Sequence, residues 1–82
     1  MQTIQMTYTV SRGKMAGQVL VPHRNKEGRY IVSKTRFQED QEYPETLEQV
    51  LSYLQRGYKL RMSPRDFPGP ASLINLASIT LH

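Results

Sequence analysis

The sequence contains no cysteine. Disulfide bonds, thiolate zinc sites and a cysteine nucleophile are therefore excluded, and a reducing compartment fits this composition. Long apolar runs are also missing, since none approaches the roughly 18–20 residues that cross a bilayer. The segment 1–6 lacks the basic cluster and apolar stretch of a signal peptide. We therefore expect a soluble cytoplasmic protein.

Histidine is scarce, with His23 and His82 as its two occurrences. A metal site usually needs three or four ligands, and His23 lies in a predicted polar loop while His82 is the last residue of the sequence. Gly13 and Gly17 enclose three residues, whereas a phosphate-binding P-loop has about four between its glycines and continues with Lys and Ser or Thr. The sequence therefore predicts no metal, no cofactor and no histidine-based catalysis.

Acidic residues gather in one stretch of the chain, which contains Glu39, Asp40, Glu42, Glu45 and Glu48. General acid–base catalysis requires two carboxyl groups in unlike environments within one cleft. These acids instead precede or begin a predicted helix, where negative charge complements the helix dipole. We therefore interpret them as structural and expect a non-enzymatic protein.

Alternating apolar and polar residues predict a first strand over residues 3–10. One face of this strand carries, at every second position, Ile4, Met6, Tyr8 and Val10. A tight hairpin turn is expected over residues 11–14, because Gly13 can adopt the positive φ that such a turn needs. A second strand is expected over residues 17–21, and Pro22 ends it.

Two further strands are predicted by the same pattern. After a polar loop, the third strand is expected over residues 29–37, with a centre that is apolar on both faces. The charged segment 39–42 then breaks the pattern. Beyond the helix, a period of two returns over residues 58–63, with apolar side chains toward the core and with Lys59 and Arg61 directed away from it.

A helix is predicted over about residues 46–56. Thr46 and Gln49 have the spacing of a capping box, in which each side chain accepts from the other residue's backbone N–H. The helical i, i+3, i+4, i+7 stripe consists of Leu47, Val50, Leu51 and Leu54. Arg56 suits the negative end of the helix dipole, and Gly57 supplies a left-handed C-terminal cap.

A proline-rich loop is expected over residues 64–70, because its prolines restrict the backbone. The apolar tail 72–82 leaves two interpretations open, a helical turn over 73–77 or a short strand near 79–81. The chain is thus predicted to form one α+β domain over residues 1–82, in the order β-β-β-α-β. One helix packs on one face of a small antiparallel sheet, and the other face is solvated or covered by a partner.

Basic residues outnumber acidic ones by 11 to 7, which gives a formal net charge of +4. This bias favours anionic partners, and it also serves solubility. The candidate binding residues lie on the open sheet face and in the adjoining loops: Arg12, Lys14, Arg24, Lys26, Arg29, Lys34, Arg36, Lys59 and Arg61. On the third strand, a shift by one residue would exchange Lys34 and Arg36 with their neighbours. We therefore expect a binding module that engages nucleic acid or an acidic protein surface.

A second interpretation is a protein–protein module, either a homodimer or an adaptor or inhibitor of a larger complex, of the kind that phages and plasmids encode. The apolar tail is long for so small a core, and a proline-flanked aromatic loop is stiff enough to present to a partner. A tail strand can add to the edge of another sheet. The candidate interface residues are Phe67, Leu73, Ile74, Leu76, Ile79 and Leu81. We expect no membrane partner and no small-molecule substrate.

Overall fold

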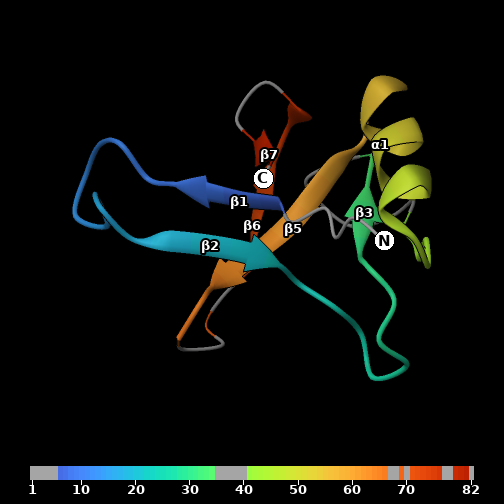
Figure 1. The fold of residues 1–82 in the computed structure, drawn as a ribbon, viewed down its shortest axis with the longest axis horizontal. Helices are drawn as coiled ribbons and strands as arrows, with labels where there is room; N and C mark the ends of the chain where they lie inside the picture. The colour runs from blue at the N-terminus through green and yellow to red at the C-terminus, as the bar shows by residue number, and fades with distance from the viewer. Residues whose placement is uncertain (1–5, 35–40, 67–68, 70, 77–78, 82) are drawn as a thin grey trace.

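The computed structural model describes residues 6–34, 41–66, 69, 71–76 and 79–81. Over these residues the chain forms one helix and seven short strands that join into one sheet (Figure 1). In chain order the elements are β1 (Met6–Thr9), β2 (Val19–Pro22), β3 (Val32–Ser33), β4 (Gln41–Glu42), α1 (Leu47–Gln55), β5 (Lys59–Pro64), β6 (Ser72–Ile74) and β7 (Thr80–Leu81). The α+β class is as predicted, but the described strands are more numerous than the predicted β-β-β-α-β order.

The strand β5 is the centre of the sheet. One edge of β5 pairs with β6. The opposite edge pairs with β3 at its start and with β2 at its end, and all three pairings are antiparallel. The strand β1 pairs with β2, β7 pairs with β1, and β4 pairs with β3. The path of paired strands is therefore β4-β3-β5-β2-β1-β7, in which β3 and β2 share one edge of β5 and β6 occupies the other.

Between β2 and β3 the chain leaves the edge of β5 and forms a loop over residues 24–30. His23 N–H donates to Arg61 O at 2.8 Å, and Arg61 N–H donates to Ile31 O at 3.0 Å. The segments before and after the loop are therefore both hydrogen-bonded to Arg61 of β5. Because both strands hold the base of the loop, the loop projects from the sheet at a fixed point.

The third strand is shorter than the predicted segment 29–37. Tyr30 forms an isolated bridge with Arg24 rather than a continuous ladder, and its N–H donates to Pro44 O at 3.0 Å. The ladder with β5 is limited to the two residues of β3. The last part of the predicted strand, 35–37, lies outside the described residues.

The acidic segment 39–42, predicted as a break in the pattern, contains β4. Gln41 lies opposite Ser33, and Glu42 lies opposite Val32. A short edge strand pairs through its backbone and needs no apolar side chain of its own. Alternation of apolar residues therefore does not detect it.

Two prolines lie within the central ladder. Pro22 belongs to β2 and Pro64 to β5. His23 N–H donates to Arg61 O at 2.8 Å, and Arg65 N–H donates to Val19 O at 3.0 Å. Hydrogen-bonded and non-hydrogen-bonded pairs alternate along an antiparallel ladder, so both prolines occupy non-hydrogen-bonded positions. A proline at such a position removes no ladder bond. The predicted loop 64–70 therefore starts one residue too early.

The turn between β1 and β2 is wider than the predicted tight hairpin. Val10 N–H donates to Gln18 O at 2.9 Å, and Gly17 N–H donates to Val10 O at 2.8 Å. Gly13 and Gly17 have φ of 89° and 90°, in the left-handed region that favours glycine. The second strand consequently begins at Val19 instead of residue 17.

The C-terminal tail contributes two strands to the sheet, since β6 pairs with β5 and β7 pairs with β1. Between them, Ile79 N–H donates to Leu76 O at 3.2 Å and closes a turn. The strand interpretation is confirmed by β7, whereas β6 replaces the first part of the helical turn expected over 73–77. Ile74 and Ile79 pack against the core, so the tail is part of the fold.

The helix α1 agrees closely with its prediction. Thr46 Oγ1 accepts from Gln49 N–H at 3.2 Å, and Gln49 Oε1 accepts from Thr46 N–H at 3.2 Å and Glu45 N–H at 2.9 Å. The capping box is therefore complete. At the other end, Arg56 is the C-cap and Gly57 has a left-handed φ of 96°.

The core lies between α1 and one face of the sheet. The helix contributes Val50 and Leu54, whereas Leu47 and Leu51 are partly buried at its margin. The remaining core residues come from the strands and the 24–30 loop, and they are Met6, Leu20, Tyr30, Val32, Leu60 and Met62. The predicted inward alternation of β5 is thus confirmed.

The opposite face of the sheet is only partly open. Alternation along β5 places Lys59, Arg61 and Ser63 on this face. Lys59 is exposed and Arg61 is half-buried, but Ser63 is 6% exposed and Ser33, opposite Lys59, is fully buried. The expectation of a solvated face therefore holds for Lys59, holds in part for Arg61, and fails for Ser63 and Ser33.

Candidate functional site

A line of cations runs along β5 on the face opposite the core. Lys59 and Arg61 occupy this face, and Arg65 continues the line, because its N–H donates to Val19 O in the same ladder. At about 3.3 Å per residue, the interval from Lys59 to Arg65 spans about 20 Å. Lys59 and Arg65 are exposed, and Arg61 is half-buried. We call Lys59, Arg61 and Arg65 the β5 stripe.

Arg65 is a member of the stripe that the sequence-based selection misses. Pro64 predicts the end of the strand, so Arg65 is assigned to a loop. The signal that identifies Arg65 is the period-two series Lys59, Arg61, Ser63 and Arg65, which continues across the proline.

The β5 stripe has no carboxylate partner in the described part of the chain. The ion pair seen among the described residues lies within the 24–30 loop and joins Arg29 Nη2 to Glu27 Oε2 at 4.0 Å. Asp66 follows Arg65 and is exposed, but the two form no ion pair. The stripe therefore keeps its positive charge.

The predicted residues Arg12 and Lys14 are exposed in the loop between β1 and β2. This hairpin projects at the end of the molecule away from α1 (Figure 1). Its second strand begins at Val19, whose carbonyl accepts from Arg65 N–H. The hairpin that carries Arg12 and Lys14 therefore has its second strand beside the Arg65 end of the β5 stripe.

The predicted cations of the 24–30 loop lie elsewhere, because this loop and the hairpin project from different sides (Figure 1). Arg24 is held over the ring of Tyr30, with its Cζ 4.3 Å from the ring centroid. Arg29 pairs with Glu27, and Lys26 is exposed. Arg24 and Arg29 therefore have partners within the loop, and the base of this loop is hydrogen-bonded to Arg61 of the β5 stripe.

The last two predicted cations belong to the segment after β3. Lys34 is exposed and follows Ser33, which lies opposite Lys59. It therefore adjoins the Lys59 end of the stripe. Arg36 lies outside the described residues.

The residues of the alternative interface are divided between the sheet and the surface. The strands β6 and β7 contain Leu73, Ile74 and Leu81. Leu76 is 37% exposed, whereas Ile79 packs against the core. Phe67 lies outside the described residues.

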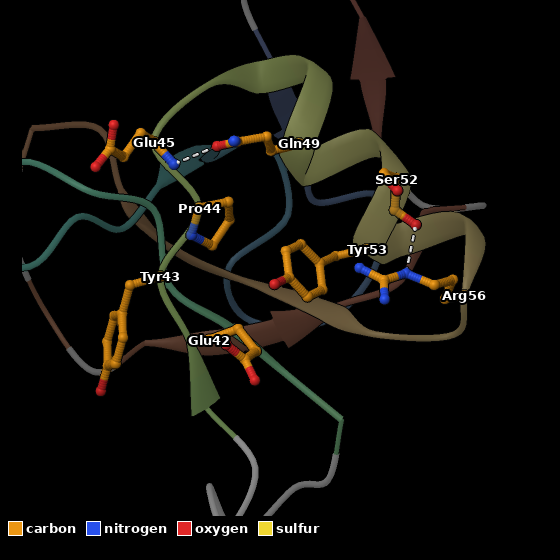
Figure 2. A pocket seen from close by; sticks show the side chains of 8 residues that line it. All are labelled: Glu42, Tyr43, Pro44, Glu45, Gln49, Ser52, Tyr53 and Arg56. Atoms are coloured by element: carbon orange, nitrogen blue, oxygen red, sulfur yellow. Dashed lines mark hydrogen bonds between the residues drawn. The ribbon is translucent and has the colours of Figure 1, made fainter.

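A groove of about 490 Å³ lies between the segment that follows β4 and one face of α1 (Figure 2). We call it the helix groove, and its lining residues are Glu42, Tyr43, Pro44, Glu45, Gln49, Ser52, Tyr53 and Arg56. The four helical members recur at i, i+3, i+4 and i+7 and so form one face of α1. Sequence patterns do not predict this groove, because it depends on how the chain before the helix folds back beside it.

One wall of the helix groove is an aromatic and cationic cluster. Arg56 Cζ lies 4.3 Å from the ring centroid of Tyr53 and 5.7 Å from that of Tyr58. The two rings meet edge to face, with centroids 4.9 Å apart and an interplanar angle of 74°. Arg56 Nε also donates to Ser52 O at 3.4 Å. The ring contacts and this bond together orient the Arg56 guanidinium along the wall.

Among the described residues, no group of three or more His, Cys, Asp or Glu side chains is arranged to hold a metal ion. No helix in the same part of the chain is long and apolar enough to span a membrane. The chain matches no protein family, no curated protein and no solved structure.

Proposed function

We propose that this protein is a non-enzymatic binding module that engages nucleic acid through the phosphate backbone. The β5 stripe is the main contact, and Arg12 and Lys14 in the hairpin extend it. The observation that carries the proposal is the alignment of three cations over about 20 Å, without a carboxylate partner in the described chain.

A nucleic acid fits this line better than an acidic protein surface does. Each strand of a duplex carries one phosphate per about 3.4 Å of helix axis, so a row of cations about 20 Å long can meet several phosphates at once. Arginine presents a planar fork that binds phosphate through two parallel hydrogen bonds. Arg61 and Arg65 supply two such forks.

The tyrosines of the sheet favour backbone contact over base recognition. Proteins that read single strands stack bases on exposed aromatic rings. Here Tyr30 is part of the core, and Tyr8 and Tyr58 pack against it. We therefore propose a sequence-tolerant interaction with duplex phosphates. We also propose a cytoplasmic location, with which the cysteine-free composition is compatible.

The tail-mediated interface has less support. The strands β6 and β7 already pair with β5 and β1, and Ile74 and Ile79 contribute to the packing of the core. Among the described tail residues, Leu76 offers a large exposed apolar side chain.

Fluorescence anisotropy with a labelled duplex of mixed sequence, titrated over a range of salt concentrations, tests the proposed function. The variant K59Q/R65Q removes two exposed cations of the β5 stripe. Because each phosphate contact contributes about 0.9 to the slope of log K against log salt, the slope should fall by about 2. The matched control, K26Q/R56Q, removes two charges outside the stripe and should leave the slope close to that of the parent.

Equal losses in the two double variants would show that net charge alone drives binding and that the stripe is not the site. Failure of the parent protein to bind the duplex at low salt would reject the proposed function. Circular dichroism of each variant establishes that the comparison is made between folded proteins.

A further inference from the structure

The loop that joins β1 to β2 is exposed along its whole length. Every residue from 11 to 18 is exposed, and the hairpin projects from the sheet at the end away from α1 (Figure 1). A Cβ atom placed on Gly13 or Gly17 would meet no described atom within 4 Å. We call residues 11–18 the hairpin tip. Because open space surrounds these glycines, another molecule can approach the tip closely.

The hairpin tip has a defined shape of its own. Ala16 N–H donates to Gly13 O at 3.2 Å, and Gln18 N–H donates to Met15 O at 3.0 Å. These bonds close two successive turns, so the backbone of the tip is ordered although its side chains lie in solvent. A partner that binds the tip therefore loses little affinity to the cost of ordering it.

Met15 is the large apolar residue of this tip. It is 43% exposed, the highest value among the large apolar residues of the described chain. Single exposed apolar residues are common on protein surfaces, but the surroundings of Met15 are unusual. Gly13, Ala16 and Gly17 carry a methyl group or no side chain at all. The flexible side chain of Met15 can therefore enter a narrow gap without obstruction by these neighbours.

Positive charge accompanies Met15, and no negative charge opposes it. Arg12 and Lys14 are exposed, and neither forms an ion pair with a described residue. No acidic residue precedes Glu27 in the sequence. In architectural DNA-binding proteins, basic residues contact the duplex while an apolar residue such as methionine inserts between base steps. The composition of the tip therefore favours a duplex as its partner.

The hairpin tip lies within reach of a duplex on the β5 stripe. Met15 precedes Val19 by four positions, and Val19 O accepts from Arg65 N–H. Even a fully extended chain would keep the Met15 Cα within about 14 Å of the Val19 Cα. This distance corresponds to about four base pairs along a duplex axis. One short duplex can therefore contact Arg65 and Met15 at the same time.

We propose that Met15 is a wedge that inserts between adjacent base pairs of a DNA duplex. Arg12 and Lys14 hold the tip on the flanking phosphates, and insertion of the thioether unstacks the base step and kinks the duplex. The wedge rests on the duplex binding proposed for the β5 stripe, and it adds a separate action by an uncharged residue. Because unstacking an intact step costs free energy, the protein should prefer a duplex in which stacking is already broken.

Fluorescence anisotropy with two labelled DNA duplexes of one sequence, one intact and one with a single-nucleotide gap at its centre, tests the wedge. The parent protein should bind the gapped duplex about tenfold more tightly, since part of the unstacking cost is already met. In M15Q, which keeps the length of the side chain and removes its apolar character, the preference should fall below about twofold. M15L should keep the preference, because leucine also acts as a wedge. The matched control L76Q alters an exposed apolar residue outside the tip and should keep it as well.

Salt titrations separate the wedge from the β5 stripe. M15Q removes no charge, so its slope of log K against log salt should equal that of the parent, whereas K59Q/R65Q should lower the slope and keep the preference for the gap. Salt-dependent binding without preference for the gapped duplex would overturn the wedge and leave the stripe in place. Retention of the full preference by M15Q, or its loss in L76Q, would also overturn the wedge. Failure of the parent to bind either duplex at low salt would reject the proposed function as well.

Discussion

Arg24 lies over the ring of Tyr30, with its Cζ 4.3 Å from the ring centroid, and donates from Nη2 to the hydroxyl of the same residue at 2.6 Å. Tyr30 is 6% exposed and belongs to the core. The Asn25 side chain accepts from Glu27 N–H and Arg29 N–H at 3.0 and 2.9 Å, and these bonds fix the turn between Arg24 and Tyr30. The 24–30 loop is therefore held by its own side chains and packed onto the core through Tyr30.

We predict that the variant R24Q lowers the free energy of unfolding by about 1–2 kcal/mol, because it removes a cation–π contact and a charge-assisted hydrogen bond. Urea denaturation followed by circular dichroism measures this loss. The control is K26Q, which removes the same charge from the exposed tip of the same loop. An equal loss in K26Q would assign the effect to net charge rather than to the contact with Tyr30.

The capping box gives a second prediction. Replacing Thr46 by alanine should cost about 1 kcal/mol of stability, because it leaves the N–H of Gln49 without its acceptor. Replacing Gln49 by alanine should cost less, since Gln49 lies inside α1, where the higher helix propensity of alanine offsets part of the loss. In a double-mutant cycle the two losses should not add, because both residues belong to one reciprocal pair. Additive losses would mean that each bond acts alone.

The features that the sequence predicts well are those with a regular period. The helix follows from its leucine stripe and from the Thr46–Gln49 pair, and β5 follows from the alternation that buries Leu60 and Met62. Each of these patterns is a local repeat of apolar residues that face the core, so it is read from residues that are close together in the sequence. They therefore need no knowledge of the partner strands.

The features that the sequence misses depend on long-range pairing. β4 consists of Gln41 and Glu42, which carry no apolar signal, and it exists because β3 offers a partner. Pro64 remains in β5 because its position in the ladder with β2 needs no N–H, a fact that only the register reveals. The place of Arg65 in the β5 stripe is missed for the same reason, because its hydrogen bond to Val19 continues the ladder beyond Pro64. The helix groove likewise requires the position of the chain before α1.

The tail supplies a third prediction, with a matched pair of apolar residues. Ile79 packs against the core, whereas Leu76, three residues earlier, is 37% exposed. We expect I79A to lower the free energy of unfolding by about 2 kcal/mol and L76A by less than about 0.5 kcal/mol. Thermal denaturation compares the two variants with the parent. Similar small losses for both would show that the tail packs only weakly on the core.

The last prediction concerns the backbone at the end of the β5 stripe. Arg65 N–H donates to Val19 O at 3.0 Å and continues the ladder beyond Pro64. The variant R65Q removes the charge and keeps this N–H, whereas R65P removes both. R65P should therefore be less stable than R65Q by about 1 kcal/mol, the usual net contribution of one backbone hydrogen bond. The two variants are compared by urea denaturation, and hydrogen exchange at Leu20 and Val21 reports whether the ladder opens. Equal stability would show that the Arg65–Val19 hydrogen bond contributes nothing, and Arg65 would then lose its fixed place in the line with Lys59 and Arg61.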